Sequence, residues 1–270
     1  MSLVRVVIRA KDEAAKIGTT LARMNAQTLH SQMELVVVDS GSTDGSVEIA
    51  RAAGATLIEI PAESFTYGGS LNTGCEGTEA PFIVALSAHA FPPDEHWLER
   101  MLHPFSDARV ACACGYVKGP HGKPLAGRLV QDLELAQLNP YWGYSNSSGA
   151  FRSELWLERP FRADMVGTED KEWAWHWLHR GKLVVVDPAL AVEHSHHDEG
   201  PRAVFRRSFN EWAGYGAFLE LEPYGGRELV RDWWRDLDGY RSHLRARVGW
   251  RRAAKLLGKW RGRQAGAPAL

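Results

Sequence analysis

The segment 35–45, LVVVDSGSTDG, constrains the fold more than any other stretch of the sequence. Its four apolar residues, three of them β-branched, predict a short strand buried on both faces, as at the centre of a parallel sheet. The strand ends at Asp39, and small residues lead to Asp44, which can cap a following helix. Ligands of open α/β sheets bind beyond the carboxyl ends of the strands, so Asp39 is expected to face a binding crevice. The alternative is that both aspartates only end a strand and cap a helix.

Strand and helix patterns alternate over the first 60 residues. Strands are expected at 3–8 and 56–60, on either side of the strand that ends at Asp39, with helices between them. This alternation implies right-handed parallel crossovers. Further strands are expected at 81–86, 110–117, 183–186 and 191–193, and helices at 95–103 and 125–138. The predicted fold class is α/β, with a Rossmann-like, mostly parallel central sheet flanked by helices.

The net charge of −1 hides an asymmetry. Residues 241–263 carry nine Lys or Arg and no acid, so the rest of the chain carries about −10. Aromatic and aliphatic residues recur among these charges at helical spacing. The pattern fits a basic amphipathic element that contacts an anionic membrane surface or packs on protein, including a second subunit in a homodimer. No nucleic acid is expected as a partner, because no recognised reading module accompanies the basic segment.

Two features favour a cytoplasmic location. No apolar run approaches the roughly 18 residues needed to cross a bilayer, and the start, MSLVRVVIRAKDE, is charged too soon for a signal peptide. If the basic segment binds lipid, the protein would be peripheral at the inner face of the membrane. The three cysteines, Cys75, Cys112 and Cys114, lack metal-ligand spacing and fit reduced core thiols.

Four motifs place polar and small residues after apolar segments. FTYGGSLNTG at 65–74 predicts a turn into a short helix whose glycines and free N–H groups can approach a phosphate. LSAHAFP at 86–92 follows a strand, TED at 168–170 opens a helix, and EHSH at 193–196 follows the last strand. Acids at a helix entry also simply favour the helix dipole.

In this order and spacing, the motifs resemble those of family 2 glycosyltransferases over roughly residues 3–197. The tail resembles extensions of bacterial, rhamnosyltransferase-like members. The resemblance implies the GT-A fold for a catalytic domain at 1–199. Its halves would be 1–116 for the nucleotide sugar and 117–199 for the acceptor, followed by a helical basic extension at 200–270.

The resemblance also implies roles for individual residues. Asp39 takes the place of the acid that receives the nucleotide base, and Gly69 stands where many relatives have a basic residue. Asp170 takes the place of the catalytic base, and Glu169 either binds acceptor hydroxyls or orients Asp170. Ser147 and Trp173 are acceptor candidates, although Trp173 fits a core stripe equally well. The donor-binding set is Arg9, Ala10, Glu13, Asp39, Ser42, Asn72, Ser87, Ala88 and His89.

Ser87-Ala88-His89 replaces the Asp-x-Asp pair that holds a divalent cation in relatives. Mg²⁺ prefers oxygen ligands, whereas imidazole suits softer cations such as Mn²⁺. Either His89 holds such an ion with His194 or His196, or His89 hydrogen-bonds the phosphate directly and little metal is needed. A third interpretation is that His89 only packs at the strand end.

The expected activity is inverting transfer of a hexosyl or deoxyhexosyl group from a UDP- or dTDP-linked sugar to a hydroxyl acceptor. The acceptor would be a glycan, a lipid-linked molecule or a small-molecule natural product. The reaction needs a base for the acceptor proton and stabilisation of the departing diphosphate. A sugar-phosphate nucleotidyltransferase is one alternative, although IRAKDEAAKIG is a poor glycine-rich loop. A catalytically degenerate scaffold protein is another, suggested by Gly69 and the missing acidic pair.

Overall fold

The computed structural model describes residues 2–120, 122–194, 199–238 and 246–266. The chain forms two compact units. We call Met1–Asp164 with Asp170–Ser195 the sheet unit, and Met165–Glu169 with His196–Leu270 the helical unit. The helical unit therefore includes five residues from the middle of the segment in which the acceptor-binding half was expected.

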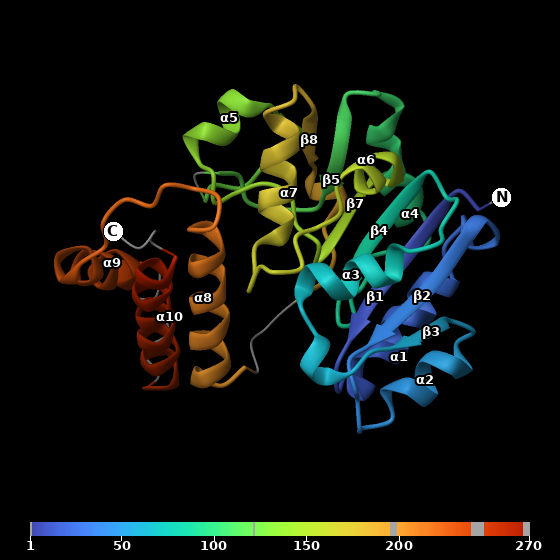
Figure 1. The fold of residues 1–270 in the computed structure, drawn as a ribbon, viewed down its shortest axis with the longest axis horizontal. Helices are drawn as coiled ribbons and strands as arrows, with labels where there is room; N and C mark the ends of the chain where they lie inside the picture. The colour runs from blue at the N-terminus through green and yellow to red at the C-terminus, as the bar shows by residue number, and fades with distance from the viewer. Residues whose placement is uncertain (1, 121, 195–198, 239–245, 267–270) are drawn as a thin grey trace. The chain divides into compact units, whose positions relative to one another are not determined.

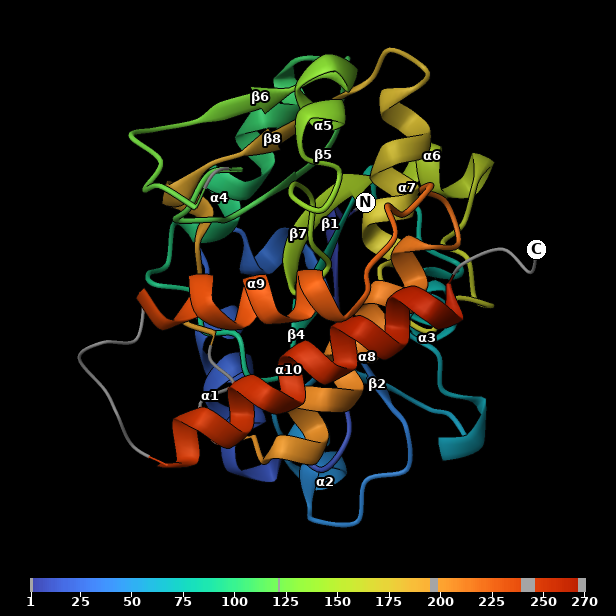
Figure 2. The ribbon, with the colours of Figure 1, turned by 90° about the vertical axis from the view of Figure 1, so that its left-hand side faces the viewer.

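The sheet unit is built on a sheet to which the described residues contribute eight strands, in the order β3-β2-β1-β4-β7-β5-β8-β6 (Figures 1 and 2). Strands β3, β2, β1 and β4 are mutually parallel, as are β5 and β8, whereas β7 and β6 pair antiparallel with their neighbours. The expected mostly parallel α/β sheet is confirmed. The strands are β1 (Val4–Ala10), β2 (Met33–Asp39), β3 (Thr56–Glu59), β4 (Phe82–Ser87), β5 (Val110–Cys114), β6 (Leu129–Gln131), β7 (Ser148–Arg152) and β8 (Leu183–Val186).

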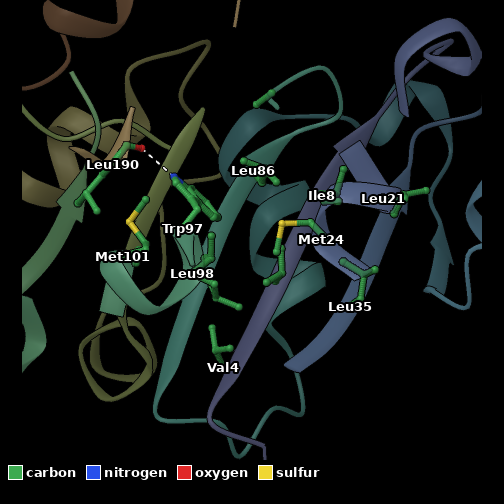
Figure 3. Packing of buried hydrophobic residues seen from close by; sticks show 14 of the residues in the cluster. Val4, Ile8, Leu21, Met24, Leu35, Leu86, Trp97, Leu98, Met101 and Leu190 are labelled. Carbon is green, nitrogen blue, oxygen red and sulfur yellow. Dashed lines mark hydrogen bonds between the residues drawn. The ribbon is translucent and has the colours of Figure 1, made fainter. Parts of the chain in front are cut away.

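Apolar side chains cover both faces of this sheet. Along β1, Ile8 joins one buried cluster and the adjacent Val7 joins the other, because successive side chains of a strand point to opposite faces. Figure 3 shows the first cluster, in which Met24 of α1 (Ala14–Asn25) lies beside Ile8. In the same cluster the indole N–H of Trp97 donates to the carbonyl of Leu190 at 2.9 Å.

The other helices of the sheet unit are short. They are α2 (Ser46–Ala52), α3 (Tyr67–Cys75), α4 (Trp97–Leu102), α5 (Leu133–Leu138), α6 (Ser153–Glu158), α7 (Glu169–Leu178) and the 3₁₀ turns η1 (His30–Gln32), η2 (Ala62–Ser64), η3 (His103–Ser106) and η4 (Pro188–Leu190). Helix α7 starts at Glu169 of the helical unit and continues in the sheet unit.

Three predicted elements were wrong in extent or type. Residues 125–138 do not form one helix, because the edge strand β6 pairs with β8 and α5 starts only where the side chain of Asp132 accepts from the N–H of Leu135. The strand expected at 110–117 ends at Cys114, where the backbone at Gly115 packs so closely that an added Cβ would lie 2.3 Å from the nitrogen of Ala191. Residues 191–193 form only an isolated bridge, between Phe91 and Glu193.

The helical unit contains the three helices α8 (Pro201–Tyr215), α9 (Gly226–Asp238) and α10 (Ala246–Ala265) within the described residues. Figures 1 and 2 show α10 alongside α8. The helices approach closely through glycine: a Cβ at Gly262 of α10 would lie 2.4 Å from the carbonyl oxygen of Phe209. The expected helical extension is therefore present. No helix among the described residues is long and apolar enough to span a bilayer.

Candidate functional site

The loops that follow β1 and β2 are tied together by hydrogen bonds. Asp39 ends β2 with 1% of its surface exposed, and its carboxylate accepts from the N–H groups of Gly41 and Ser42 and from the hydroxyl of Ser42. The Ser42 hydroxyl oxygen accepts in turn from the N–H of Asp12 at 2.8 Å. Asp39 and Ser42 thus lie at the carboxyl edge of the sheet, as predicted, and their own hydrogen bonds fix the shape of the turn.

Arg9 links the end of β1 to the start of α3. Its guanidinium donates to the carbonyl of Tyr67 at 2.7 Å and lies 5.6 Å from the centroid of the Tyr67 ring. The hydroxyl of Thr66 caps α3 by accepting from the N–H of Gly69 at 2.9 Å. A Cβ at Gly69 would lie 2.6 Å from this hydroxyl oxygen, so a larger residue here would disturb the cap.

Asn72 forms hydrogen bonds within the protein through both its amide nitrogen and its amide oxygen. Its Nδ2 donates to the carbonyl of Phe161 at 2.8 Å, while its Oδ1 accepts from the indole of Trp156 and the N–H of Phe161. These bonds fasten α3 to the chain after α6. The geometry therefore assigns Asn72 to the framework and does not support the expected donor contact.

His89 lies between an acid and a second histidine. Its Nδ1 is 2.8 Å from the carboxylate of Glu13, and its Nε2 is 3.0 Å from Nε2 of His194. The two rings stack with centroids 4.7 Å apart. Ser87 is close by, its hydroxyl 3.4 Å from Nδ1 of His89. The side chain of Ala88, between Ser87 and His89, is buried in the core. The carbonyl of Ala88 accepts a hydrogen bond from the hydroxyl of Thr20.

The positions of the protons follow from these contacts. A carboxylate only accepts hydrogen bonds, so Nδ1 of His89 carries a proton toward Glu13. The close approach of the two Nε2 atoms then requires one further proton between His89 and His194. Either His194 donates to a neutral His89, or a protonated His89 donates to His194.

The contact between His89 and His194 also affects whether these residues can bind a divalent cation. A cation between the two rings would need an unprotonated nitrogen from each imidazole, whereas the 3.0 Å contact between the Nε2 atoms fits a shared proton. Among the residues the structure describes, no three His, Cys, Asp or Glu side chains form a group that could hold a metal ion. His196, the other expected ligand, lies outside these residues. The described side chains thus fit a hydrogen-bonding pair and not a cation site.

Asp170 is joined to the His89 segment by the loop that precedes β7. Its Oδ2 accepts from the N–H of Asn146 at 3.1 Å. The next residue, Ser147, accepts through its carbonyl from the N–H of Ser87 at 2.9 Å. Asp170 is half-buried, and two adjacent loop residues, Asn146 and Ser147, thus connect it to the end of β4.

Lys171 is a site residue that the sequence interpretation missed. Its ammonium donates to the carbonyls of Gly143 at 3.1 Å and Tyr144 at 2.5 Å. It therefore holds the start of the loop that reaches Asn146. Its position directly after the expected catalytic acid was the available signal.

Trp173 lies in the core and not in an acceptor site. Its side chain is 0% exposed, its indole donates to the carbonyl of Arg159 at 2.7 Å, and Phe151 and Phe161 pack on its ring. The acceptor role expected for Trp173 is therefore wrong for this geometry, and the core alternative describes it. Glu169 is also buried, whereas Ser147 is half-buried beside Asn146.

Solved structures share this architecture. The mannosyltransferase PcManGT from Pyrobaculum calidifontis, solved with GDP-Man and Mn²⁺, is 21% identical with a TM-score of 0.65, covering 93% of this chain and 72% of that one. S. aureus TarS 1–349 in complex with UDP is 13% identical with a TM-score of 0.59, covering 98% and 90%. The sheet and the polar strand ends of the present chain define its class as a GT-A protein.

Sequence comparison gives the family. Glycosyl transferase family 2 matches residues 5–161, more than half of the chain, and the chain belongs to this family. It is 27% identical over 227 residues to the O-antigen chain rhamnosyltransferase RfbN of Salmonella typhimurium LT2, covering 77% of this chain and 70% of RfbN. It is 27% identical over 212 residues to WbaN of Salmonella anatum, covering 73% and 65%. The protein is accordingly a glycosyltransferase that uses nucleotide sugars.

Proposed function

We propose that this enzyme transfers a hexosyl or deoxyhexosyl group, with inversion, from a UDP- or dTDP-linked donor to a hydroxyl acceptor. One observation supports this most strongly. In the loop before β7, Asn146 hydrogen-bonds to Asp170, and the adjacent Ser147 hydrogen-bonds to Ser87. A carboxylate and an imidazole pair are thereby joined at the edge of the sheet where α/β proteins bind ligands.

Asp170 acts as the base in this proposal. It takes the proton of the acceptor hydroxyl while that oxygen attacks the anomeric carbon and the bond from this carbon to the diphosphate breaks. Hydrogen bonds from Asn146 and Lys171 N–H groups hold its carboxylate in place. The side chain of the preceding residue, Glu169, is buried. We propose that Glu169 orients the turn from which Asp170 projects.

The His89–His194 pair faces the diphosphate. When a diphosphate oxygen takes the place of His194 at Nε2 of His89, a protonated His89 can donate a hydrogen bond to it, while Glu13 fixes the ring through Nδ1. A divalent cation would need ligands outside this pair, such as His196 or the diphosphate itself. Arg9, Ala10, Asp39 and Ser42 form the adjoining wall for the nucleotide, and Ser147 lies toward the acceptor.

The names of two relatives support the proposed donor and acceptor. RfbN and WbaN carry names that specify rhamnosyl transfer, which favours a deoxyhexosyl donor and a glycan or lipid-linked acceptor. We assign donor binding to residues 1–116 and acceptor binding to 117–199. Contact of the basic helices with a membrane surface or a second copy stays a proposal, which vesicle sedimentation and light scattering would distinguish.

A donor panel tests the proposal. The purified protein is incubated with UDP-, dTDP- and GDP-linked hexoses and deoxyhexoses, with and without Mn²⁺, Mg²⁺ or EDTA, and release of the nucleoside diphosphate is measured. We expect turnover of a UDP- or dTDP-linked sugar that survives EDTA, and an inverted anomeric configuration in the product. Loss of all turnover in EDTA would contradict the hydrogen-bonding role of the histidine pair. Retention of configuration would contradict the direct attack assisted by Asp170.

A further inference from the structure

Thr168 has a strained backbone conformation immediately before the Glu169–Asp170 acids. Its φ of 60° lies in the left-handed region, which is unfavourable for a β-branched residue and persists only where neighbouring structure holds it. Its hydroxyl donates to the carbonyl of Gly167 at 2.7 Å. Something outside the turn must therefore favour this conformation.

Helix α8 supplies the contact. An added Cβ at Gly214 would lie 2.1 Å from the carbonyl oxygen of Gly167 and 2.3 Å from the hydroxyl oxygen of Thr168. One turn earlier on α8, the backbone of Asn210 lies 3.3 Å from the Cβ position of Gly167. Residues 165–169 accordingly group with the helical unit.

We infer that Gly214 is a positioning residue for the transfer reaction, because α8 holds the Thr168 turn in the conformation that delivers Asp170. This inference rests on the proposed role of Asp170. The turn is continuous with the acid: Glu169 follows Thr168, and Asp170 is the next residue. A rotation of the Thr168 backbone would therefore change the direction in which α7 starts and move the carboxylate.

The expected effect is on turnover and not on donor affinity. Displacement of a reacting group by about 1 Å can lower a rate by about 100-fold. Gly214→Ala places a methyl group on the turn, so kcat should fall by about 10- to 100-fold while the KM for the donor stays within about twofold. If Gly214 had only a structural role, Gly214→Ala would lower the melting temperature without lowering kcat selectively at an unchanged KM.

A matched control exists in the same unit. Gly262 of α10 is equally tight, since its Cβ position is 2.4 Å from the carbonyl oxygen of Phe209, but it contacts α8 and not the turn. Gly262→Ala should lower the melting temperature by an amount similar to Gly214→Ala and keep kcat near that of the wild type. Equal losses of kcat in both variants would overturn the inference.

A second, less disruptive variant keeps the inference testable if Gly214→Ala does not fold. In Gly167→Ala the added Cβ would lie 3.3 Å from the backbone of Asn210, and a small shift of the neighbouring atoms can accommodate it. We expect it to fold and to lose several-fold in kcat, and wild-type kcat in this variant would overturn the inference. Asp170→Asn is measured alongside: if it stays active, the proposed function itself fails. If it is inactive while both glycine variants turn over normally, only the role of Gly214 is refuted.

Discussion

The carboxylate of Glu13 lies 2.8 Å from Nδ1 of His89, although 76 residues separate them in the sequence. The contact joins the loop after β1 to the end of β4, and it fixes which nitrogen of His89 carries a proton. An acid from the loop after β1 is thus the partner of the imidazole that follows β4.

Glu13→Gln should lower kcat/KM by about 10-fold, in the range typical of a lost partner of a functional histidine. Because Glu13 acts through His89, the same change in a His89→Ala background should have almost no further effect. Steady-state kinetics of the four proteins measure this coupling. Exposed Glu48→Gln is the control, and fully additive losses would show that Glu13 acts independently of His89.

Lys171→Met should remove the hydrogen bonds that hold the loop 143–147 against α7. The ammonium holds two backbone carbonyls, so its loss should displace Asn146 and with it the hydrogen bond to Asp170. We expect kcat to fall by about 10-fold and donor affinity, measured by calorimetry, to be retained. Lys255→Met, at an exposed position of α10, serves as the control. Unchanged kcat would remove Lys171 from the site.

Asn72→Ala should destabilise the fold. The change leaves the indole of Trp156 and both backbone groups of Phe161 without their partner, and we expect a loss of about 3 kcal/mol in the free energy of unfolding. Urea unfolding measures it. Unchanged stability together with a tenfold loss of donor affinity would instead support the donor contact implied by the family.

His176 predicts a pH dependence of stability. Burial, followed by the nearby Arg159 and Arg180, lowers the pKa of His176 from 6.5 to about 4. The unfolded chain therefore binds a proton at higher pH than the folded one, and the free energy of unfolding should decrease as the pH falls from 6.5 toward 4. Above this window His176 is neutral in both states. His176→Gln should flatten this part of the stability curve, and an identical slope in the variant would refute the assignment.

The sequence predicted what local patterns determine. The β-branched run before Asp39 became β2, buried on both faces, and the small residues after it became the turn that Asp39 holds. The polar residues at or just after the ends of three strands, Glu13, Asp39 and His89, were located because parallel strands end at one edge.

The features that the sequence did not predict concern partners that are distant in sequence. Asn72 meets Phe161 across 89 positions, and the ring of Trp173 is enclosed by residues of β7 and the chain after α6. Neither contact leaves a local signal. The helical spacing in 125–138 was misleading for the same reason, since pairing with β8 decides the structure of β6.

The most direct test of the account is the turnover of Asp170→Asn with the donor identified by the panel. We expect kcat to fall by about 1,000-fold, within the range for removal of a general base. Donor affinity should stay within about threefold of wild type, because the amide keeps the shape of the carboxylate. Asp164→Asn, an exposed acid paired with Arg162, is the control and should turn over normally. Wild-type kcat in Asp170→Asn would contradict the account.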